Sequence, residues 1–598
     1  MKKPHKQYSK IGMIAYFLKG SFLLFALSII FNLVAVATSV LVPRIIGFTV
    51  DSVLNTLPVS AENTFIASLL GGVDYVSTHF YIIPLAIVVL AAAGAIIKFF
   101  NMYLNSLAGE KLMYRMRNTL FTHIQRLPMN WHVEHRTGDI IQRCTSDTQT
   151  ILTFISTQLM SLIRIVALIG LSLAFMFAMN VRLALVAAIF MPILFGYSLI
   201  FQFKAKKHFR RCDEEEGVLS TRAQENISAV RVVKAFGRER YECEKFDKQN
   251  EYYTGLWVHL EKFLAMFWTS SDFLAELQLL FIVVFGTVFA VNGSLSAGEL
   301  ITFISYNALL IGPVRELGRI ISNMSKAGVS FDRIGEIINA EPEDYGEPTK
   351  PLSGDIRFDH VSFEYTKDTP ILKDISFTVP KGSTLGIVGS TGSGKSTITY
   401  LLDRLYAPTS GDIYIGETNI NDAPLVDLRS SIGLVLQDGY LYSGTLKDNI
   451  GMASNAIQEE IVRAAKVACI DESIMSFKSG YDTIIGEKGV TLSGGQRQRV
   501  SIARTLLKSA PILIFDDSLS AVDSDTDIAI RKNLAGEMGD TTVIIISHRI
   551  TTVMNADNII VLDDGKIAEQ GTNAELLQQN GIYKRIYDRQ MAIKEEAE

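Results

Sequence analysis

Cysteine is scarce in this sequence and follows no pattern. Cys144, Cys212, Cys243 and Cys469 stand at irregular spacing along 598 residues. Disulfide-rich domains and zinc sites use closely and regularly spaced cysteines, so neither class is indicated. A small-residue cleavage site after the first apolar run is also missing, and we therefore expect that run to remain in the mature chain.

Basic residues are missing from two long stretches. No Lys or Arg occurs between Arg44 and Lys98, or between Lys262 and Arg315, whereas residues 1–10 and 204–211 are basic. By the positive-inside rule, the basic segments face the cytoplasm.

The net charge is −5, and no Lys/Arg cluster is interleaved with aromatic residues. The sequence therefore gives no indication of nucleic-acid binding.

Apolar residues, in contrast, are abundant and gathered in long runs. A membrane-spanning helix needs about 20 residues. Six runs reach that length, at about residues 21–43, 81–105, 152–178, 183–203, 263–291 and 298–320. An even number of spans places both termini in the cytoplasm. The polar segments between them, about 106–151 and 204–262, carry charge at helical spacing, which predicts that the helices continue into the cytoplasm.

The composition changes after the sixth run. Residues 341–354, EPEDYGEPTKPLSG, contain helix-breaking Pro and Gly and indicate a linker. Beyond it, PILIFD and TTVIIIS are short continuous apolar runs, typical of buried parallel strands. We expect a cytoplasmic segment over 1–20, a membrane domain over 21–325, a linker over 326–354 and a soluble domain over 355–598.

A phosphate-binding motif opens the soluble domain. GIVGSTGSGKST, residues 386–397, has the spacing G-x-x-x-x-G-K-S between a strand-like and a helix-like segment. Its glycines let backbone N–H groups point at phosphate oxygens, and the following helix N-terminus adds its dipole. Lys395 supplies a charge for the β- and γ-phosphates, and Ser396 a hydroxyl for Mg²⁺. The residues expected to bind nucleotide are Gly389, Ser390, Thr391, Gly392, Ser393, Gly394, Lys395, Ser396 and Thr397.

Two adjacent acids end an apolar run in ILIFDDSLSAVD, residues 512–523. Asp516 closes a predicted buried strand and is expected to reach Mg²⁺ directly or through its water shell. The plain alternative is an acid that only caps the next segment of the chain.

A second anion-binding helix end begins at Leu492, in LSGGQRQRVSIARTL. A serine and two glycines open this helix, and here the sequence resembles an ABC transporter. The resemblance covers essentially the whole chain and implies ATP and Mg²⁺ as cofactors. In this family the helix end, here Ser493, Gly494, Gly495 and Gln496, closes on the γ-phosphate of ATP held by the other nucleotide domain.

The resemblance assigns roles to four further residues. Tyr365 in FEY matches the adenine-stacking aromatic, and Gln437 in LVLQD the metal-reaching glutamine that couples the nucleotide to the membrane domain. Asp523 in SAVD matches the loop that crosses the dimer, and His548 in ISHR the catalytic switch histidine. Alone, such a Tyr is more often a packing residue and such a His a satisfied polar residue. Their order around two strong motifs favours the functional roles.

The membrane half resembles that of ABC exporters. Residues 127–151 and 227–246 are similar to the exporters' intracellular loops, and the membrane domain precedes the nucleotide domain on one chain. The resemblance implies an α-helical membrane domain of six transmembrane helices with long cytoplasmic extensions, followed by an α/β P-loop ABC ATPase domain. It also implies a bacterial cell-membrane protein with both termini and the ATPase domain in the cytoplasm.

The second acid departs from the family pattern. Most members place a Glu after the strand-end Asp to activate the attacking water, whereas this chain has Asp517. Asp is one methylene shorter, and a misplacement of about 1 Å can cost roughly a hundredfold in rate. The pattern resembles the degenerate chain of heterodimeric bacterial exporters, whose partner carries the Glu. The intact LSGGQ agrees with this interpretation, because such a chain lends that segment to its partner's site. The intact His548 departs from it, because some such chains lose this histidine together with the Glu. A homodimer that hydrolyses ATP adequately with Asp is the alternative.

The implied function is ATP-driven export of drugs or other amphipathic small molecules across a lipid bilayer. A homodimeric lipid or polysaccharide flippase has the same architecture. A soluble ABC ATPase of DNA repair or translation is disfavoured by the six spans. Charged residues within spans are expensive and usually functional, so Arg164, Asp272 and Glu276 are candidates for lining the substrate cavity. Snorkelling near a span end is the alternative for Arg164.

Overall fold

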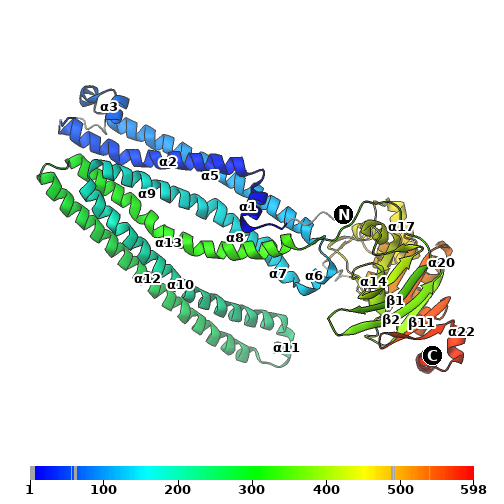
Figure 1. Ribbon diagram of the computed structural model, residues 1–598. Coiled ribbons are helices and arrows are strands. Elements are labelled where there is room, and N and C mark those ends of the chain that lie inside the picture. Colours follow the sequence, from blue (N-terminus) through cyan, green and yellow to red (C-terminus); the bar gives the residue numbers. More distant parts are fainter. Residues whose placement is uncertain are drawn as a thin grey trace. The chain divides into compact units, whose positions relative to one another are not determined.

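The computed structural model describes residues 7–55, 57–58, 64–486, 489, 492–537 and 539–597. The chain divides into two compact units, coloured along the sequence in Figure 1. We call Met1–Arg126 with His135–Glu341 the helical unit, and Leu127–Glu134 with Pro342–Glu598 the sheet unit.

The helical unit confirms the six predicted spans. Within the described residues, six helical stretches are long and apolar enough to cross a membrane. They are α2 (Phe22–Phe48) with its π-helical continuation Thr49–Leu54, α5 (Ile82–Ile124), Thr137–Met179 from α7 (Thr137–Gln142) through α8 (Thr148–Thr153) to α9 (Met160–Met179), α10 (Val181–Ser228), α12 (Glu239–Val291) and α13 (Ala297–Asn339). Shorter helices are α1 (Lys10–Leu18), α3 (Thr64–Leu69), α4 (Val73–Thr78) and α11 (Val230–Ala235).

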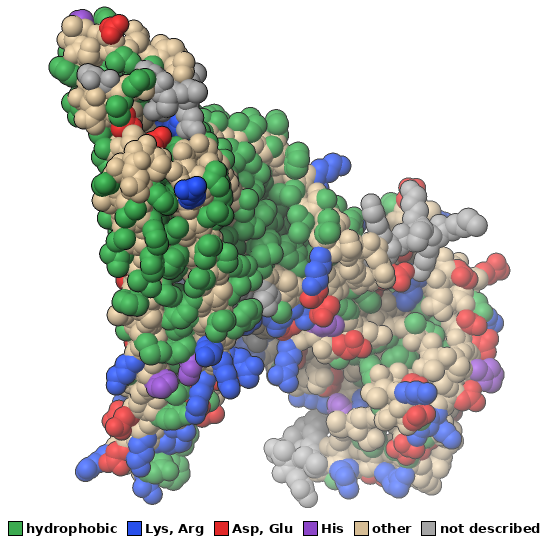
Figure 2. All heavy atoms as spheres, turned by 60° about the vertical axis from the view of Figure 1, so that its left-hand side comes forward, with side chains coloured by type: hydrophobic (Ala, Val, Ile, Leu, Met, Phe, Trp, Pro, Cys, Tyr) green, Lys and Arg blue, Asp and Glu red, His purple; other side chains and the backbone are tan. Residues whose placement is uncertain are grey.

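Several of these helices are much longer than a bilayer requires. α10 has 48 residues and α12 has 53, which corresponds to roughly 70–80 Å at about 1.5 Å per residue, against an apolar core of about 30 Å. The predicted continuation of the helices beyond the membrane is thus confirmed. Figure 2 shows hydrophobic side chains over the long helices and basic side chains gathered at one of their ends.

The start of α13 is held tightly against α2. Asp51, which is 7% exposed, accepts hydrogen bonds from the Gly298 backbone N–H at 2.8 Å and from the Ser296 hydroxyl at 2.5 Å. Farther along, the Tyr306 hydroxyl donates to the Val40 carbonyl oxygen at 3.0 Å. The backbones approach so closely that a Cβ on Gly298 would lie 2.2 Å from the Gly47 carbonyl oxygen.

The sheet unit contains a six-stranded sheet of order β12-β11-β3-β10-β9-β6. Its strands are β3 (Thr384–Gly389), β6 (Ile432–Val435), β9 (Ile512–Asp516), β10 (Thr542–Ile546), β11 (Asn558–Asp563) and the antiparallel edge strand β12 (Lys566–Gly571). A four-stranded antiparallel sheet of order β2-β1-β4-β5 comprises β1 (Ile356–Glu364), β2 (Pro370–Val379), β4 (Ser410–Ile415) and β5 (Thr418–Asn419). β7 (Gly444–Thr445) and β8 (Ile484–Ile485) pair separately.

The sheet unit also contains helices. They are α6 (Met129–Glu134), α14 (Lys395–Leu402), α15 (Leu425–Ser431), α16 (Leu446–Gly451), α17 (Gln458–Val467), α18 (Asp471–Met475), α19 (Gly494–Leu506), α20 (Ser524–Glu537), α21 (Ile550–Val553), α22 (Asn573–Gln578) and α23 (Ile582–Ala597). Along β9, Ile512 and Ile514 belong to one apolar core and Leu513 and Phe515 to another. This alternation confirms a strand buried on both faces, and hence the predicted α/β domain.

The expected linker divides differently in the structure. α13 continues to Asn339, so residues 326–339 are helical, because no proline occurs between Pro313 and Pro342. The following residues pack on the sheet unit. Asp427 accepts hydrogen bonds from the Thr349 backbone N–H at 3.0 Å and its hydroxyl at 2.6 Å. Arg429 binds both carboxylate oxygens of Glu343, at 2.8 and 2.9 Å.

The glycine contact between α2 and α13 leads to a test. We expect Gly298→Ala to lower the thermal midpoint of the detergent-solubilised protein by several degrees, because overpacking costs about 1–3 kcal/mol. Gly328→Ala is the matched control on the same helix, since a Cβ there meets nothing within 4 Å and Ala favours the helix. Equal midpoints for the two variants in a fluorescence-detected melt would contradict the tight contact.

Candidate nucleotide-binding site

Four loops of the sheet unit begin at the same edge of the six-stranded sheet. β3, β10, β9 and β6 are parallel neighbours, with Ile546 opposite Asp516 and Val435 opposite Phe515. The carboxyl ends of these strands therefore meet, and ligands of open α/β sheets bind at that edge. The loop after Gly389 and the residues Gln437, Asp516 and His548 all follow from these four strand ends.

The loop after β3 has the backbone that a phosphate cradle requires. Gly392 and Gly394 have φ of +83° and +96°, a region open to glycine at little cost. A Cβ on Gly389 would lie 2.3 Å from the Leu562 carbonyl oxygen, so glycine is required there as well. α14 starts directly after Gly394, which aims its N-terminus into the loop.

Lys395 is folded into this loop and is 6% exposed. Its Nζ donates to the carbonyl oxygens of Gly389 at 3.0 Å and Ser390 at 2.7 Å. Burial lowers the pKa of Lys395, and the charges of Asp517 and Asp516 oppose that shift. An anion in the loop would give this ammonium group the partner that carbonyl oxygens supply only in part.

Ser396 and Asp516 meet as the sequence predicts. The Ser396 hydroxyl donates to Asp516 Oδ1 at 2.9 Å, and Asp516 Oδ2 is buried with no hydrogen-bond partner among the described residues. Burial raises the pKa of Asp516, and the hydrogen bond from Ser396 counteracts it. An orphaned carboxylate oxygen beside a serine hydroxyl fits Mg²⁺, which usually takes one or two carboxylates and completes its shell with phosphate oxygens and water.

Asp517 is held firmly by its backbone. Its φ is +46°, which Asp tolerates better than most residues, and its N–H donates to the Ile546 carbonyl oxygen at 2.9 Å. Its Oδ1 is buried and has no hydrogen-bond partner within the described part of the chain. The carboxylate therefore has capacity to accept a proton or a hydrogen bond from a ligand or a water.

Tyr365 stands next to the phosphate loop. Its hydroxyl lies 3.2 Å from Thr397 Oγ1, and its ring meets Phe363 and Tyr406 edge to face at 4.8 and 5.1 Å. Burial raises the pKa of Tyr365 despite the hydrogen bond with Thr397. The side chain is held in place yet remains 48% exposed, as a ring that stacks on a base would need to be.

The LSGGQ segment forms a capped helix start. Ser493 accepts from the Gln496 N–H at 3.2 Å, and the Gln496 side chain accepts from the Ser493 N–H at 2.9 Å, a reciprocal capping box. A Cβ on Gly495 would lie 2.8 Å from the Ala521 carbonyl oxygen. Among the described residues, no hydrogen bond joins this helix end to residues 389–397 of the same chain.

The three remaining candidates lie at exposed positions of the loops. The Gln437 carbonyl oxygen accepts from Gln498 Nε2 at 3.4 Å, and the His548 carbonyl oxygen from Gln590 at 2.7 Å. Asp523 accepts from the Thr526 N–H at 3.0 Å, which caps α20, and bonding with Thr526 lowers the pKa of Asp523.

Two residues that sequence reasoning missed connect these loops. Gln498 donates to Gln437 and also accepts from the Ala521 N–H at 3.0 Å. Arg549 donates to the carbonyl oxygens of Ser520 at 2.7 Å and Val522 at 3.0 Å. Their closeness in sequence to LSGGQ and to His548 was the only available signal.

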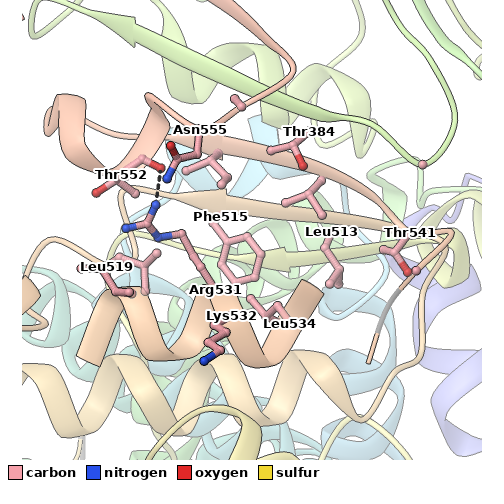
Figure 3. Close-up of a pocket in the computed structure, with 16 residues that line it drawn as sticks. Thr384, Leu513, Phe515, Leu519, Arg531, Lys532, Leu534, Thr541, Thr552 and Asn555 are labelled. Atoms are coloured by element: carbon pink, nitrogen blue, oxygen red, sulfur yellow. Dashed lines mark hydrogen bonds between the residues drawn. The ribbon is translucent and has the colours of Figure 1, made fainter. Parts of the chain in front are cut away.

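A cavity of about 490 Å³ lies on the face of the six-stranded sheet to which Leu513 and Phe515 point (Figure 3). Leu513, Phe515 and Val543 line it, together with Arg531, which donates to the Thr552 carbonyl oxygen at 3.2 Å. Successive strand residues point to opposite faces, so Asp516 points away from the face where Phe515 lines this cavity. The cavity is therefore separate from the nucleotide site.

Two of the three membrane candidates form ion pairs, each with a residue of α13. Arg164 on α9 pairs with Glu316 on α13 at 3.3 Å, and Asp272 on α12 pairs with Arg315 on α13 at 2.6 Å. Glu276 is exposed and has no hydrogen bond or ion pair among the described residues. The structure thus joins the predicted Arg164 and Asp272 to α13 residues that were not predicted, rather than to each other.

Comparison with known proteins agrees with the architecture. Residues 25–314 match the ABC transporter transmembrane region and residues 372–520 the ABC transporter model of the nucleotide domain. The chain is 37% identical to the uncharacterized ABC transporter ATP-binding protein YknU of Bacillus subtilis (strain 168), over 82% of this chain and 85% of that one. It is 33% identical to a putative multidrug export ATP-binding/permease protein of Staphylococcus aureus (strain NCTC 8325 / PS 47), over 94% and 96%.

A solved structure extends the similarity to the fold. A bacterial Atm1-family ABC exporter with ATP bound superposes with a TM-score of 0.78 at 27% identity, covering 94% of this chain and 98% of that one. The six apolar helices, the α/β domain and the motif order therefore have one explanation. The chain belongs to the ABC transporters and is a multi-pass membrane protein of the exporter type, with a cytoplasmic ATPase domain on the same chain.

Proposed function

We propose that this chain is one half of a heterodimeric exporter of amphipathic small molecules, and that its own ATP site is slow. The observation that carries the proposal is Asp517 at the position after the strand-end Asp516. The intact helix end at Ser493 supports it, because that end can serve a competent site in a partner chain.

The geometry around Asp517 explains why the short acid matters. The hydrogen bond from its N–H to Ile546 fixes the backbone, so a shift of the main chain is not available to move the carboxylate forward. Oδ1 can still orient a water, but from a position set back by one methylene. A general base must lie within hydrogen-bond reach of the proton it removes, and about 1 Å of misplacement is enough to slow the step by roughly a hundredfold.

The other site residues have their expected chemistry under this proposal. Lys395 leaves its carbonyl partners for the β- and γ-phosphates, and Tyr365 stacks on the adenine. Ser396, Asp516 and Gln437 would hold Mg²⁺, which would neutralise charge on the phosphate oxygens. His548 contacts the γ-phosphate, and Asp523 crosses to the partner chain.

A complete site needs two chains. The helix end at Ser493 makes no hydrogen bond with residues 389–397 of its own chain within the described residues, so it is available to the nucleotide of the partner. The partner would carry Glu after its strand-end Asp and receive Ser493, Gly494 and Gly495 from this chain. One strong and one weak site then power transport.

The transported class is inferred from the relatives and from the membrane charges. The Staphylococcus aureus relatives carry the name of putative multidrug exporters. Arg164, Asp272 and Glu276 line the cavity in this proposal, since charged groups within membrane helices face an aqueous path rather than lipid.

The first test restores the longer acid. In the complex purified from its own host, we expect Asp517→Glu to raise ATPase by up to about twofold, because the carboxylate regains its reach and a second site then hydrolyses ATP beside the partner's. Asp517→Asn should leave the activity of the complex nearly unchanged, because the partner's site already dominates. Asp525→Glu, at an exposed position of α20, controls for the added methylene. No gain from Asp517→Glu would refute the slow site.

The second test identifies the partner. We expect the tagged chain, purified from the membranes of its own host, to give an intact complex mass equal to this chain plus one different chain. Peptide sequencing should find Glu after the strand-end Asp of that chain. A mass of two copies of this chain would refute the heterodimer and make Asp517 the base, or the water-positioning group, in both sites.

A further inference from the structure

One exposed stripe of α13 is polar, unlike the exposed surface of α5. Residues at intervals of three or four along this stripe are exposed or half-buried and are small, polar or charged. They are Ser305, Ala308, Gly312, Glu316, Arg319, Asn323 and Lys326. α13 is also the least apolar of the six candidate spans. By contrast, α5 exposes Leu85, Val88, Val89, Ile96 and Phe99. Ser305, Gly312 and Glu316 lie within the part of α13 that crosses the apolar core, where a lipid-facing surface is apolar. This stripe of α13 therefore faces a water-accessible path.

Glu316 and Arg319 of this stripe form an ion triad with Arg164 of α9, and the charges of the triad do not balance. Glu316 binds Arg164 through Oε2 at 3.3 Å and Arg319 through Oε1 at 3.1 Å. Arginine stays charged at every physiological pH, so one carboxylate faces two guanidinium groups. The Arg164 side chain is 41% exposed and that of Arg319 is 65% exposed. The triad therefore presents one surplus positive charge at an accessible surface.

The neighbouring charges do not cancel this surplus. Arg315 is 12% exposed and is occupied by Asp272 at 2.6 Å and by the Ser271 carbonyl oxygen at 2.8 Å. Glu276 lies on α12, one turn beyond Asp272, and forms no ion pair with the triad in the described residues. The negative surplus thus lies on α12 and the positive surplus between α9 and α13.

The position of the triad suits an encounter from the cytoplasmic side. Glu316 lies about 28 Å along α13 from Ala297, at about 1.5 Å per residue. The apolar core of a bilayer is about 30 Å thick. Since α13 begins on the side opposite the cytoplasm, the triad lies near the inner boundary of the core, where an amphipathic molecule entering from the cytoplasm or the inner leaflet meets it first.

We propose that Arg164, Glu316 and Arg319 form an anion-recognition site of the transport path, so that the exporter selects amphipathic molecules with a carboxylate, sulfonate or phosphate group. This inference rests on the proposed export function and names the class of its substrates. Guanidinium groups bind such anions through paired N–H donors. Glu316 holds both arginines in place and competes for them, which keeps binding weak enough for release.

Equilibrium binding tests the site independently of transport. The purified complex in lipid nanodiscs, without ATP, is titrated against carboxyfluorescein, an aromatic anion, and ethidium, an aromatic cation, by fluorescence anisotropy. We expect Arg319→Gln to weaken carboxyfluorescein binding about tenfold, the loss of one charge-assisted hydrogen bond, and to leave ethidium binding unchanged. We expect Glu316→Gln to tighten carboxyfluorescein binding several-fold, because it removes the competing carboxylate.

The opposite signs of the two variants separate recognition from structure. If the triad only stabilised α9 against α13, both variants would weaken both probes, and the inference would be refuted. It would also be refuted if wild type bound ethidium as well as or better than carboxyfluorescein. Arg240→Gln, which breaks an exposed Arg240–Glu244 pair outside the membrane, controls for loss of an ion pair. ATP-driven uptake into inverted vesicles is measured in parallel: anion binding without any uptake would refute the export function alone.

Discussion

The parallel register of β3, β10, β9 and β6 is the constraint on which the ATPase domain depends. It brings four strand ends to one edge, so that residues more than a hundred positions apart, such as Ser396 and Asp516, share a hydrogen bond of 2.9 Å. The apolar runs of these strands are buried on both faces and hold the register. A one-residue slip of β9 would turn Asp516 to the face of Phe515 and empty the metal position.

Local patterns predicted most of this architecture. Apolar run length identified the six spans, and glycine spacing identified the phosphate loop, because both are properties of contiguous residues. The boundary at 326–354 was less well predicted. α13 runs on to Asn339, and the residues after Pro342 bind the sheet unit through Glu343 and Thr349. Those contacts join segments some eighty residues apart, which no local pattern encodes.

The polar network behind the motifs was beyond prediction for the same reason. Gln498 links the loops of Gln437 and Ala521, and Arg549 holds the carbonyl oxygens of Ser520 and Val522. Both act through backbone atoms, which leave no mark in the sequence of their partners. In the membrane, Arg164 and Asp272 stood out as charges in apolar runs, but their partners Glu316 and Arg315 became apparent only when α13 was placed beside α9 and α12.

The nucleotide site and the membrane triad each carry an excess of charge of one sign, negative at the first and positive at the second. At the sheet edge, Asp516 and Asp517 face the single ammonium group of Lys395, and both acids keep a buried oxygen without a partner among the described residues. In the membrane, Arg164 and Arg319 share the single carboxylate of Glu316. The buried acid oxygens without a partner are costly, whereas Arg164 and Arg319 are 41% and 65% exposed, so their surplus charge is accessible to a ligand. The acid surplus suits a metal ion carried in with a nucleotide, and the base surplus suits an anion.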